Sequence, residues 1–192
     1  MSAVGRPHLG WVSALASPRP VGYFLSTPFC PMAGIITALL DPARIVLHLP
    51  GTTRADALDE IARLLTGHPD VTNYDGFFAD LLARDRLDTT CLGNGLALPH
   101  ARTAHVSTIV LAVGRSDPGI EFEPGQDPVH LVFLIGTPAS QPGEYLVVLR
   151  ALCKIFKDPV HRAALSAAPT PADFIAAVAA AEARLTAGIA NP

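Results

Sequence analysis

The chain has 192 residues, of which 49% are apolar and 16% are charged, and its formal net charge at pH 7 is −3. This composition supports a buried core and excludes a disordered chain, and the weakly acidic balance argues against a general nucleic-acid-binding surface. Cys30, Cys91 and Cys153 form no CxxC pair, which disfavours a disulfide framework or a structural zinc site and favours a cytoplasmic protein. Because no run of 18 apolar residues is present, we expect no direct membrane insertion.

The beginning of the chain differs from the rest. Residues 1–33 hold five prolines and show no sustained hydrophobic period, so we predict an irregular N-terminal extension there. Met32 opens the patterned part and is an alternative start site. We expect one folded domain over residues 34–187 and a short tail over residues 188–192.

The first patterned elements are one strand and two helices. A β-prone run over residues 45–49 is closed by a Pro-Gly pair. Thr53 and Asn73 are typical N-cap residues, and each precedes apolar residues at spacings of three and four. The first helix is expected to end at Gly67. Both helices are amphipathic, so each should lie on a sheet.

The middle of the chain predicts strands, and the last third predicts helices. Strands are expected over residues 96–98, 108–113 and 129–135, and the last two are nearly continuous apolar runs, as in strands covered on both faces. Helices are expected after these strands. One carries an apolar stripe over residues 145–156, the next lies around residues 160–166, and the last begins after the N-cap Thr170. The order β-α-α-β-β-β-α-α-α predicts an α/β (α+β) fold, a three-layer α/β/α sandwich with a mixed central sheet.

One segment carries most of the chemical information, GNGLALPHAR over residues 93–102. Its glycines let the backbone adopt positive φ angles and approach a ligand closely. Pro99 stiffens the chain before His100, whose neutral imidazole is a nucleophile near pH 7. Arg102 could bind an anion through its planar fork. These residues alone indicate either an anion or phosphate site, or an ordinary turn followed by a structural histidine.

The same segment resembles the active-site signature of enzyme IIA of the sugar phosphotransferase system, type 2 (the fructose, mannitol and nitrogen-regulatory family). The resemblance extends over residues 36–185. Arg84-Asp85 resembles the family's Arg-Glu pair at a helix end, and residues 128–135 resemble its central strand, in a form closer to the fructose type than to the nitrogen type.

The resemblance implies a phosphotransferase that carries a phosphohistidine. His100 would accept a phosphoryl group from the phosphocarrier protein HPr and pass it to a Cys or His of an enzyme IIB partner, as in uptake of a fructose-like sugar. Arg84 would neutralise the phosphoryl charge. The backbone of Gly93, Asn94 and Gly95 would lie near the phosphoryl group. No metal, nucleotide or other cofactor is implied.

Some residues depart from the family pattern or stay open. Tyr145 stands where many members carry a second histidine; it could donate a hydrogen bond but could not take a second proton. His130 is either an ordinary strand histidine or a neighbour of His100. We disfavour a metal site built from His100, His105 and His130, because the spacing of the first two differs from the helical zinc pair. Cys91 and Cys153 are assigned to packing, the latter in the core.

Two other functions remain open at this stage. The chain could be a regulatory protein of the nitrogen type, which signals through its phosphorylation state. It could also be a non-catalytic relative of the same fold, although the presence of both His100 and Arg84 argues against that alternative.

Overall fold

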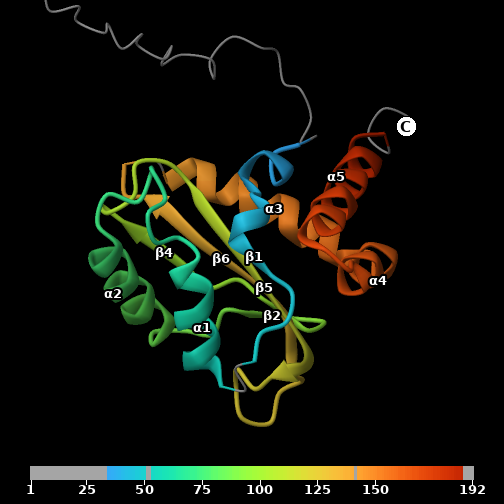
Figure 1. Ribbon diagram of the computed structural model, residues 1–192, viewed down its shortest axis with the longest axis horizontal. Helices are drawn as coiled ribbons and strands as arrows, with labels where there is room; N and C mark the ends of the chain where they lie inside the picture. The colour runs from blue at the N-terminus through green and yellow to red at the C-terminus, as the bar shows by residue number, and fades with distance from the viewer. Residues whose placement is uncertain (1–33, 51–52, 141, 188–192) are drawn as a thin grey trace, which may run out of the picture. The chain divides into compact units, whose positions relative to one another are not determined.

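The computed structural model describes residues 34–50, 53–140 and 142–187 (Figure 1). The predictions for residues 1–33 and 188–192 lie outside the described residues. The strands are β1 (Ile45–Val46), β2 (Cys91–Gly93), β3 (Leu96–Ala97), β4 (His100–Thr103), β5 (Val110–Ile120) and β6 (Val129–Pro138). The helices are α1 (Arg54–Arg63), α2 (Tyr74–Asp85), α3 (Pro142–Lys157), α4 (Pro159–Ala167) and α5 (Pro171–Ala187), with 3₁₀ turns at Thr37–Leu39 and Pro42–Arg44.

The strands form one mixed sheet, as predicted. Its order is β1-β5-β6-β3-β2, and β4 also pairs with β6. The β5–β6 and β2–β3 pairs are antiparallel, and the others are parallel. Strand β5 occupies one edge of β6, so β3 and β4 follow each other along the other edge, with Leu98 and Pro99 between them. The register places Leu96 opposite Leu131 and His100 opposite Ile135.

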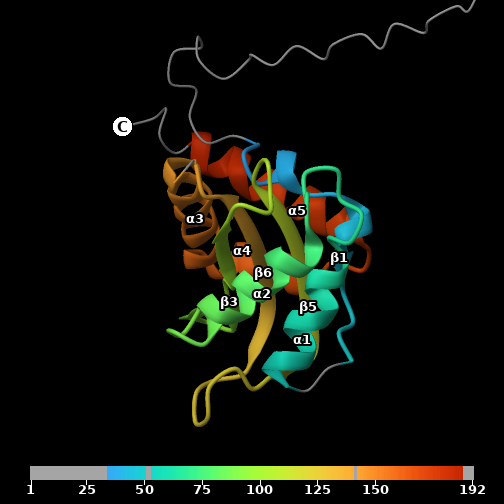
Figure 2. The same cartoon turned by 90° about the vertical axis from the view of Figure 1, so that its left-hand side faces the viewer.

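Helices cover both faces of the sheet, which confirms the three-layer architecture (Figures 1 and 2). Because side chains alternate along a strand, β6 feeds two cores at once. Phe133 and Ile135 pack with α3, α4 and α5, whereas Val132 and Leu134 pack with α1 and α2. All four side chains are fully buried, in agreement with the expectation from the continuous apolar run.

The strand order differs from the prediction between α2 and α3. Five strands lie there instead of three. Residues 91–93 form a hairpin with β3, and residues 100–103, which begin with His100, form the separate strand β4. Strands of two to four residues are too short to show a hydrophobic period, so the pattern could not reveal them. The strand predicted over residues 45–49 is also shorter and covers only Ile45–Val46.

The buried face of α3 agrees with the predicted stripe only in part, at Leu152 and Phe156. Val148, Ala151 and Ile155 are buried, whereas Leu146 is 61% exposed. The prediction that Cys153 lies in the core is wrong, because its side chain is exposed. Both faces of this helix carry apolar residues at spacings of three and four, so the spacing alone could not select the face that packs.

Candidate functional site

His100 is the first residue of β4, a strand that pairs only with β6 among the described residues. Side chains alternate along this strand. Ala101 packs in the core under α1 and α2, and the Thr103 hydroxyl donates a hydrogen bond to Asp80 of α2, 2.5 Å away. His100 therefore points to the opposite side, toward α3, and is half-buried.

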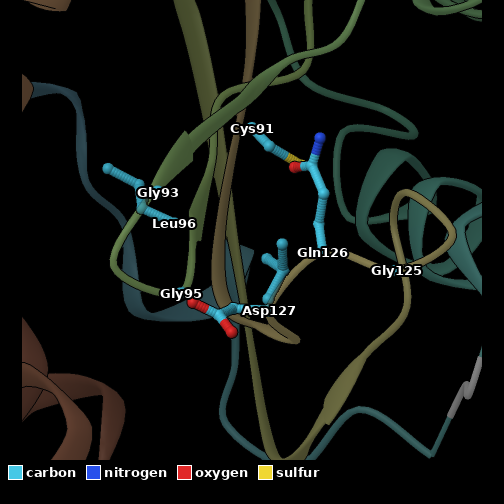
Figure 3. A pocket seen from close by; sticks show the side chains of 8 residues that line it. Cys91, Gly93, Gly95, Leu96, Gly125, Gln126 and Asp127 are labelled. Carbon is cyan, nitrogen blue, oxygen red and sulfur yellow. The ribbon is translucent and has the colours of Figure 1, made fainter.

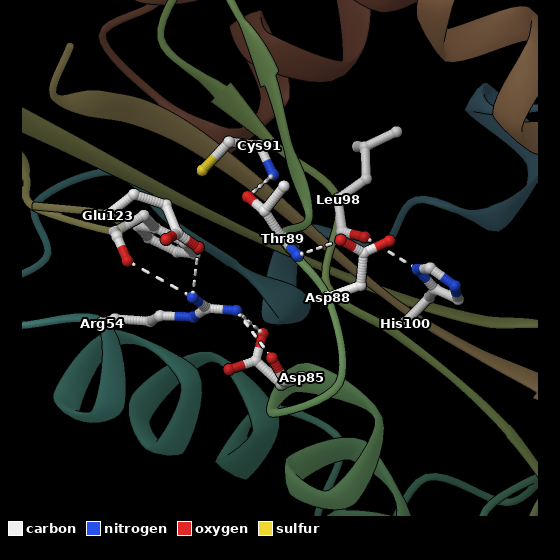
Figure 4. A network of polar contacts seen from close by, with 9 residues as sticks. Arg54, Asp85, Asp88, Thr89, Cys91, Leu98, His100 and Glu123 are labelled. Carbon is white, nitrogen blue, oxygen red and sulfur yellow. Dashed lines mark hydrogen bonds and ion pairs between the residues drawn. The ribbon is translucent and has the colours of Figure 1, made fainter. Parts of the chain in front are cut away.

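A main-chain group sets the tautomer of His100. Its Nδ1 lies 3.0 Å from the carbonyl oxygen of Leu98 (Figure 4). A carbonyl oxygen only accepts hydrogen bonds, so Nδ1 carries the proton and donates it. In the neutral ring the lone pair is then on Nε2, the atom available for attack on an electrophile.

Burial keeps the imidazole of His100 neutral. Desolvation lowers its pKa, and the hydrogen bond to Leu98 opposes this effect in part. The positive charge of Arg84 lowers the pKa further, and the negative charge of Asp85 raises it. The net shift is downward, so the ring is an uncharged nucleophile at pH 7.

Tyr145 of α3 covers one face of the His100 ring. The two ring centroids are 4.8 Å apart, and the ring planes are inclined by 27°. Burial raises the pKa of the Tyr145 hydroxyl, so this group keeps its proton at neutral pH and stays a hydrogen-bond donor. The structure thus brings together two residues that the sequence analysis singled out separately.

Arg84 supplies an unpaired positive charge at this place. It lies in the last turn of α2, and its Nη1 is buried without a hydrogen-bond partner among the described residues. Its charge lowers the pKa values of both His100 and Tyr145. A buried guanidinium nitrogen without a partner can bind an anion.

Arg54, which the sequence analysis missed, holds the neighbouring carboxylate. Its Nη2 donates to Oδ1 of Asp85 at 2.6 Å and to the Asp85 carbonyl oxygen at 2.9 Å. Its Nη1 donates to Oε1 of Glu123 at 2.8 Å (Figure 4). One signal could have pointed to it: Arg54 begins α1, and a cation in the first turn of a helix opposes the helix dipole.

Two predicted site residues are engaged elsewhere. The Nε and Nη2 atoms of Arg102 donate to the carbonyl oxygen of Ala139, at 3.1 and 2.6 Å. Nδ1 of His130 lies 3.0 Å from the carbonyl oxygen of Ser116. Of the two alternatives for His130, the structure supports the ordinary strand histidine, because the register places His100 opposite Ile135, five residues further along β6 and about 16 Å away in an extended strand.

The Gly-Asn-Gly turn also lies away from His100. Gly93, Asn94 and Gly95 all have positive φ angles, of 77°, 54° and 73°, as predicted. They join β2 to β3, and Gly95 adjoins His130 at the start of β6. Gly93 and Gly95 line a cavity of about 320 Å³, together with Cys91 and Gln126 among others (Figure 3). Four residues of β6, about 13 Å of extended strand, separate this end of β3 from His100.

Neither a metal cluster nor a spanning helix is found in the described part of the chain. No group of three or more His, Cys, Asp or Glu side chains there could hold a metal ion. No helix among the described residues is long and apolar enough to cross a membrane.

Comparison with known proteins identifies the family of the chain. Residues 38–181 match the family model described as "Phosphoenolpyruvate-dependent sugar phosphotransferase system, EIIA 2". The chain belongs to this family. EIIA proteins are phosphotransfer carriers, and the matched residues contain His100, Arg84 and Tyr145.

Relatives of two kinds are similar to the chain. The nitrogen regulatory protein of Pseudomonas aeruginosa is 30% identical over 133 residues, which cover 69% of this chain and 86% of that protein. The fructose-specific EIIA component of Haloferax volcanii is 34% identical over 111 residues, 57% of this chain and 72% of that protein.

Solved structures show the same fold. The nitrogen regulatory protein IIA-Ntr from Neisseria meningitidis aligns with a TM-score of 0.69 and 29% identity, over 75% of this chain and 99% of that one. IIA mannitol from Escherichia coli aligns with a TM-score of 0.64 and 20% identity, over 72% and 98% of the two chains, a likeness of fold alone.

Proposed function

We propose that this EIIA protein carries a phosphoryl group on His100 Nε2, which it accepts from HPr and passes to a Cys or His of an enzyme IIB partner during uptake of a fructose-like sugar. One observation carries the proposal. The Leu98 carbonyl holds the proton of His100 on Nδ1, which leaves the lone pair of Nε2 free. The unpartnered Nη1 of Arg84, and the effect of its charge on the pKa of His100, support a role for Arg84 in binding the phosphoryl group.

The arrangement suits phosphoryl transfer without proton movement at the attacking atom. The Nε2 lone pair forms a bond to phosphorus as the nitrogen–phosphorus bond to the donor histidine breaks. The proton on Nδ1 stays in its hydrogen bond to Leu98. Arg84 stabilises the negative charge of the phosphoryl oxygens, and the Tyr145 hydroxyl donates a further hydrogen bond to them. We assign no phosphoryl contact to Arg102, His130 or the turn at residues 93–95.

The surface next to His100 supports transient docking of partner proteins. Leu146 and Val147 follow Tyr145 on α3 and are 61% and 44% exposed. Leu87 follows the end of α2 and is 81% exposed. A complex of enzyme IIAMTL with phosphorylated enzyme IIBMTL from Escherichia coli has been solved on this fold. Exposed apolar side chains beside the transferring atom fit such an encounter.

The test is phosphorylation from labelled phosphoenolpyruvate in the presence of enzyme I and HPr. The wild-type chain should gain one acid-labile, base-stable phosphate, and His100→Gln should gain none. Nitrogen-15 NMR should place the phosphate on Nε2. His48→Gln is the matched control, since His48 is exposed and forms an exposed pair with Asp117. Absence of label in the wild type, or equal label in His100→Gln, would overturn the proposal.

A regulatory role is the second candidate, favoured by the relatives named as nitrogen regulatory proteins. Transfer of the labelled phosphate to a fructose-type enzyme IIB separates the two roles. Transfer supports sugar uptake, whereas labelling without transfer to IIB supports the regulatory role. A non-catalytic relative would not be labelled at all.

A further inference from the structure

We propose that Arg54 is a positioning residue for phosphoryl transfer: by binding Asp85, it keeps the adjacent Arg84 guanidinium free for the phosphoryl group. This inference rests on the proposed function. It concerns residues of α1 and of the β5–β6 connection, neither of which contains His100.

The contacts of Arg54 converge on the last turn of α2. One guanidinium nitrogen binds both the carboxylate and the main-chain carbonyl of Asp85, at 2.6 and 2.9 Å. Arg54 and Asp85 are largely buried, with 21% and 11% of their side chains exposed. Because Asp85 directly follows Arg84, the double contact fixes the backbone that carries Arg84.

The other half of the guanidinium is anchored to the β5–β6 connection. Nη1 of Arg54 donates to Oε1 of Glu123 at 2.8 Å and to the carbonyl oxygen of Phe122 at 3.3 Å. The guanidinium carbon also lies 5.6 Å from the centre of the Phe122 ring. At the adjacent residues, Thr53 forms a β-bridge with Glu121. Arg54 is therefore held from one side while it holds Asp85 on the other.

The charge of Asp85 explains why it must be bound. Its carboxylate acts on the His100 ring, whose pKa it raises. Arg84 and Arg86 are the cations on either side of Asp85 in the chain. A carboxylate without Arg54 would be free to draw the Arg84 guanidinium to itself and would repel an incoming phosphoryl dianion. Arg84 keeps an unpartnered Nη1 although a carboxylate is its immediate neighbour, and the Arg54–Asp85 pair accounts for this.

Four variants test the inference, namely Arg54→Gln, Asp85→Asn, the double variant and Arg63→Gln. The last is the matched control, because Arg63 is on the same helix and forms an exposed pair with Asp59. Two quantities are measured for each: the pKa of His100 by nitrogen-15 NMR, and the rate of labelling from phosphorylated HPr. Arg84, Asp85 and Tyr145 are the ionisable groups that act on or pack against His100.

Arg54→Gln should raise the pKa of His100, because the Asp85 charge loses its partner. It should also slow labelling by about tenfold, which is within the range of interaction energies between neighbouring residues. Asp85→Asn should lower the pKa. In the double variant the pKa should return toward the wild-type value and the labelling rate to within about threefold of it. Arg63→Gln should match the wild type in both.

A purely structural role for Arg54 would give a different pattern. Arg54→Gln would then leave the pKa of His100 unchanged, or the double variant would be as slow as the single one, and either result overturns the inference. If Arg54→Gln does not fold, Arg54→Lys replaces it. Arg54→Lys keeps the positive charge, so the pKa of His100 should stay near the wild-type value. A rise in this pKa as large as that expected for Arg54→Gln would contradict the inference.

The titration also separates this inference from the proposed function. It needs no phosphoryl donor, so it reports on Arg54 even if HPr does not label the wild-type chain. Labelling of the wild type with unchanged pKa values in the variants would leave the proposed function intact and remove Arg54 from it.

Discussion

The His100 ring is held by groups of different chemical kinds on its edge and on its face. The Leu98 carbonyl accepts the Nδ1 proton, and the Tyr145 ring stacks on the imidazole. The first contact selects the tautomer, and the second limits the orientation of the ring. Together they leave Nε2 as the one ring nitrogen with a free lone pair.

Replacing Tyr145 with phenylalanine separates stacking from hydrogen bonding. Tyr145→Phe keeps the aromatic face but loses the hydroxyl, so labelling of His100 should slow by about tenfold, the effect of one hydrogen bond to a charged group. Tyr145→Ala should slow labelling further, because the ring loses its cover. Rapid-quench labelling measures both rates. A Tyr145→Phe variant as fast as the wild type would show that the hydroxyl has no part in transfer.

Sequence reasoning at this scale succeeded where the signal was local. His100 and Arg84 were singled out from short motifs, and in the structure the charge of Arg84 lowers the pKa of His100. Arg54 was missed because its partners are 31 and 69 residues away along the chain, beyond the reach of any motif. The choice between the two alternatives for His130 stayed open because the register between strands depends on tertiary pairing, which no local pattern specifies.

At the scale of elements, the starts of α1 and α2 were predicted well, whereas the buried face of α3 was predicted only in part. The side chains of Thr53 and Asn73 accept hydrogen bonds from the backbone of Asp56 and Gly76, as expected for N-caps. A cap involves residues within one turn, so the sequence contains the whole interaction. The face of α3 that packs depends on the sheet beneath it, and this explains the error at Cys153.

Close packing of α1 on the sheet depends on a glycine in β5. A Cβ atom at Gly114 would lie 2.5 Å from Cδ1 of Ile61 and 2.6 Å from Cδ1 of Leu49. Gly114→Ala should therefore lower the free energy of unfolding by about 1–3 kcal/mol, the usual cost of overpacking. Urea denaturation measures this change.

Gly143→Ala is the control with the opposite expected sign. Gly143 lies in α3, with nothing within 4 Å of an added Cβ. Alanine there should raise the free energy of unfolding by up to about 1 kcal/mol through helix propensity. Equal effects of the two substitutions would contradict the packing argument.

At the scale of the whole domain, the site draws on all three layers. Strand β4 supplies His100, while α2 on one face of the sheet supplies Arg84 and α3 on the other supplies Tyr145 (Figures 1 and 2). Residues from both faces can meet because β4 lies at an edge, with β6 as its only partner among the described strands. The three layers were predictable from the chain order, but the position of β4 at the edge was not.

The last helix is tied to the first described turn by a buried carboxylate. Glu182 of α5 is 1% exposed and accepts hydrogen bonds from the backbone nitrogen atoms of Ile36 and Thr37, at 2.7 and 3.1 Å. The Thr37 hydroxyl donates to it at 2.5 Å. This contact joins residues 146 positions apart in the sequence.

Glu182→Gln should weaken that connection. The amide group of glutamine has one acceptor oxygen and would turn a donor toward another donor, so the free energy of unfolding should fall by about 2 kcal/mol. Chemical denaturation tests this, with Glu144→Gln on an exposed position of α3 as the control. A change below about 0.5 kcal/mol, the range of ordinary surface substitutions, would show that the contact adds little.

The acceptor that orients His100 belongs to the main chain, and this affects how the protein can change by mutation. Every amino acid at position 98 brings the same carbonyl oxygen, so no substitution of Leu98 deletes the acceptor itself. Selection can therefore vary this side chain for packing without touching the protonation chemistry of the neighbouring ring. Loss of the preferred tautomer requires a change in the path of the backbone, and Pro99 is the residue at which such a change would begin.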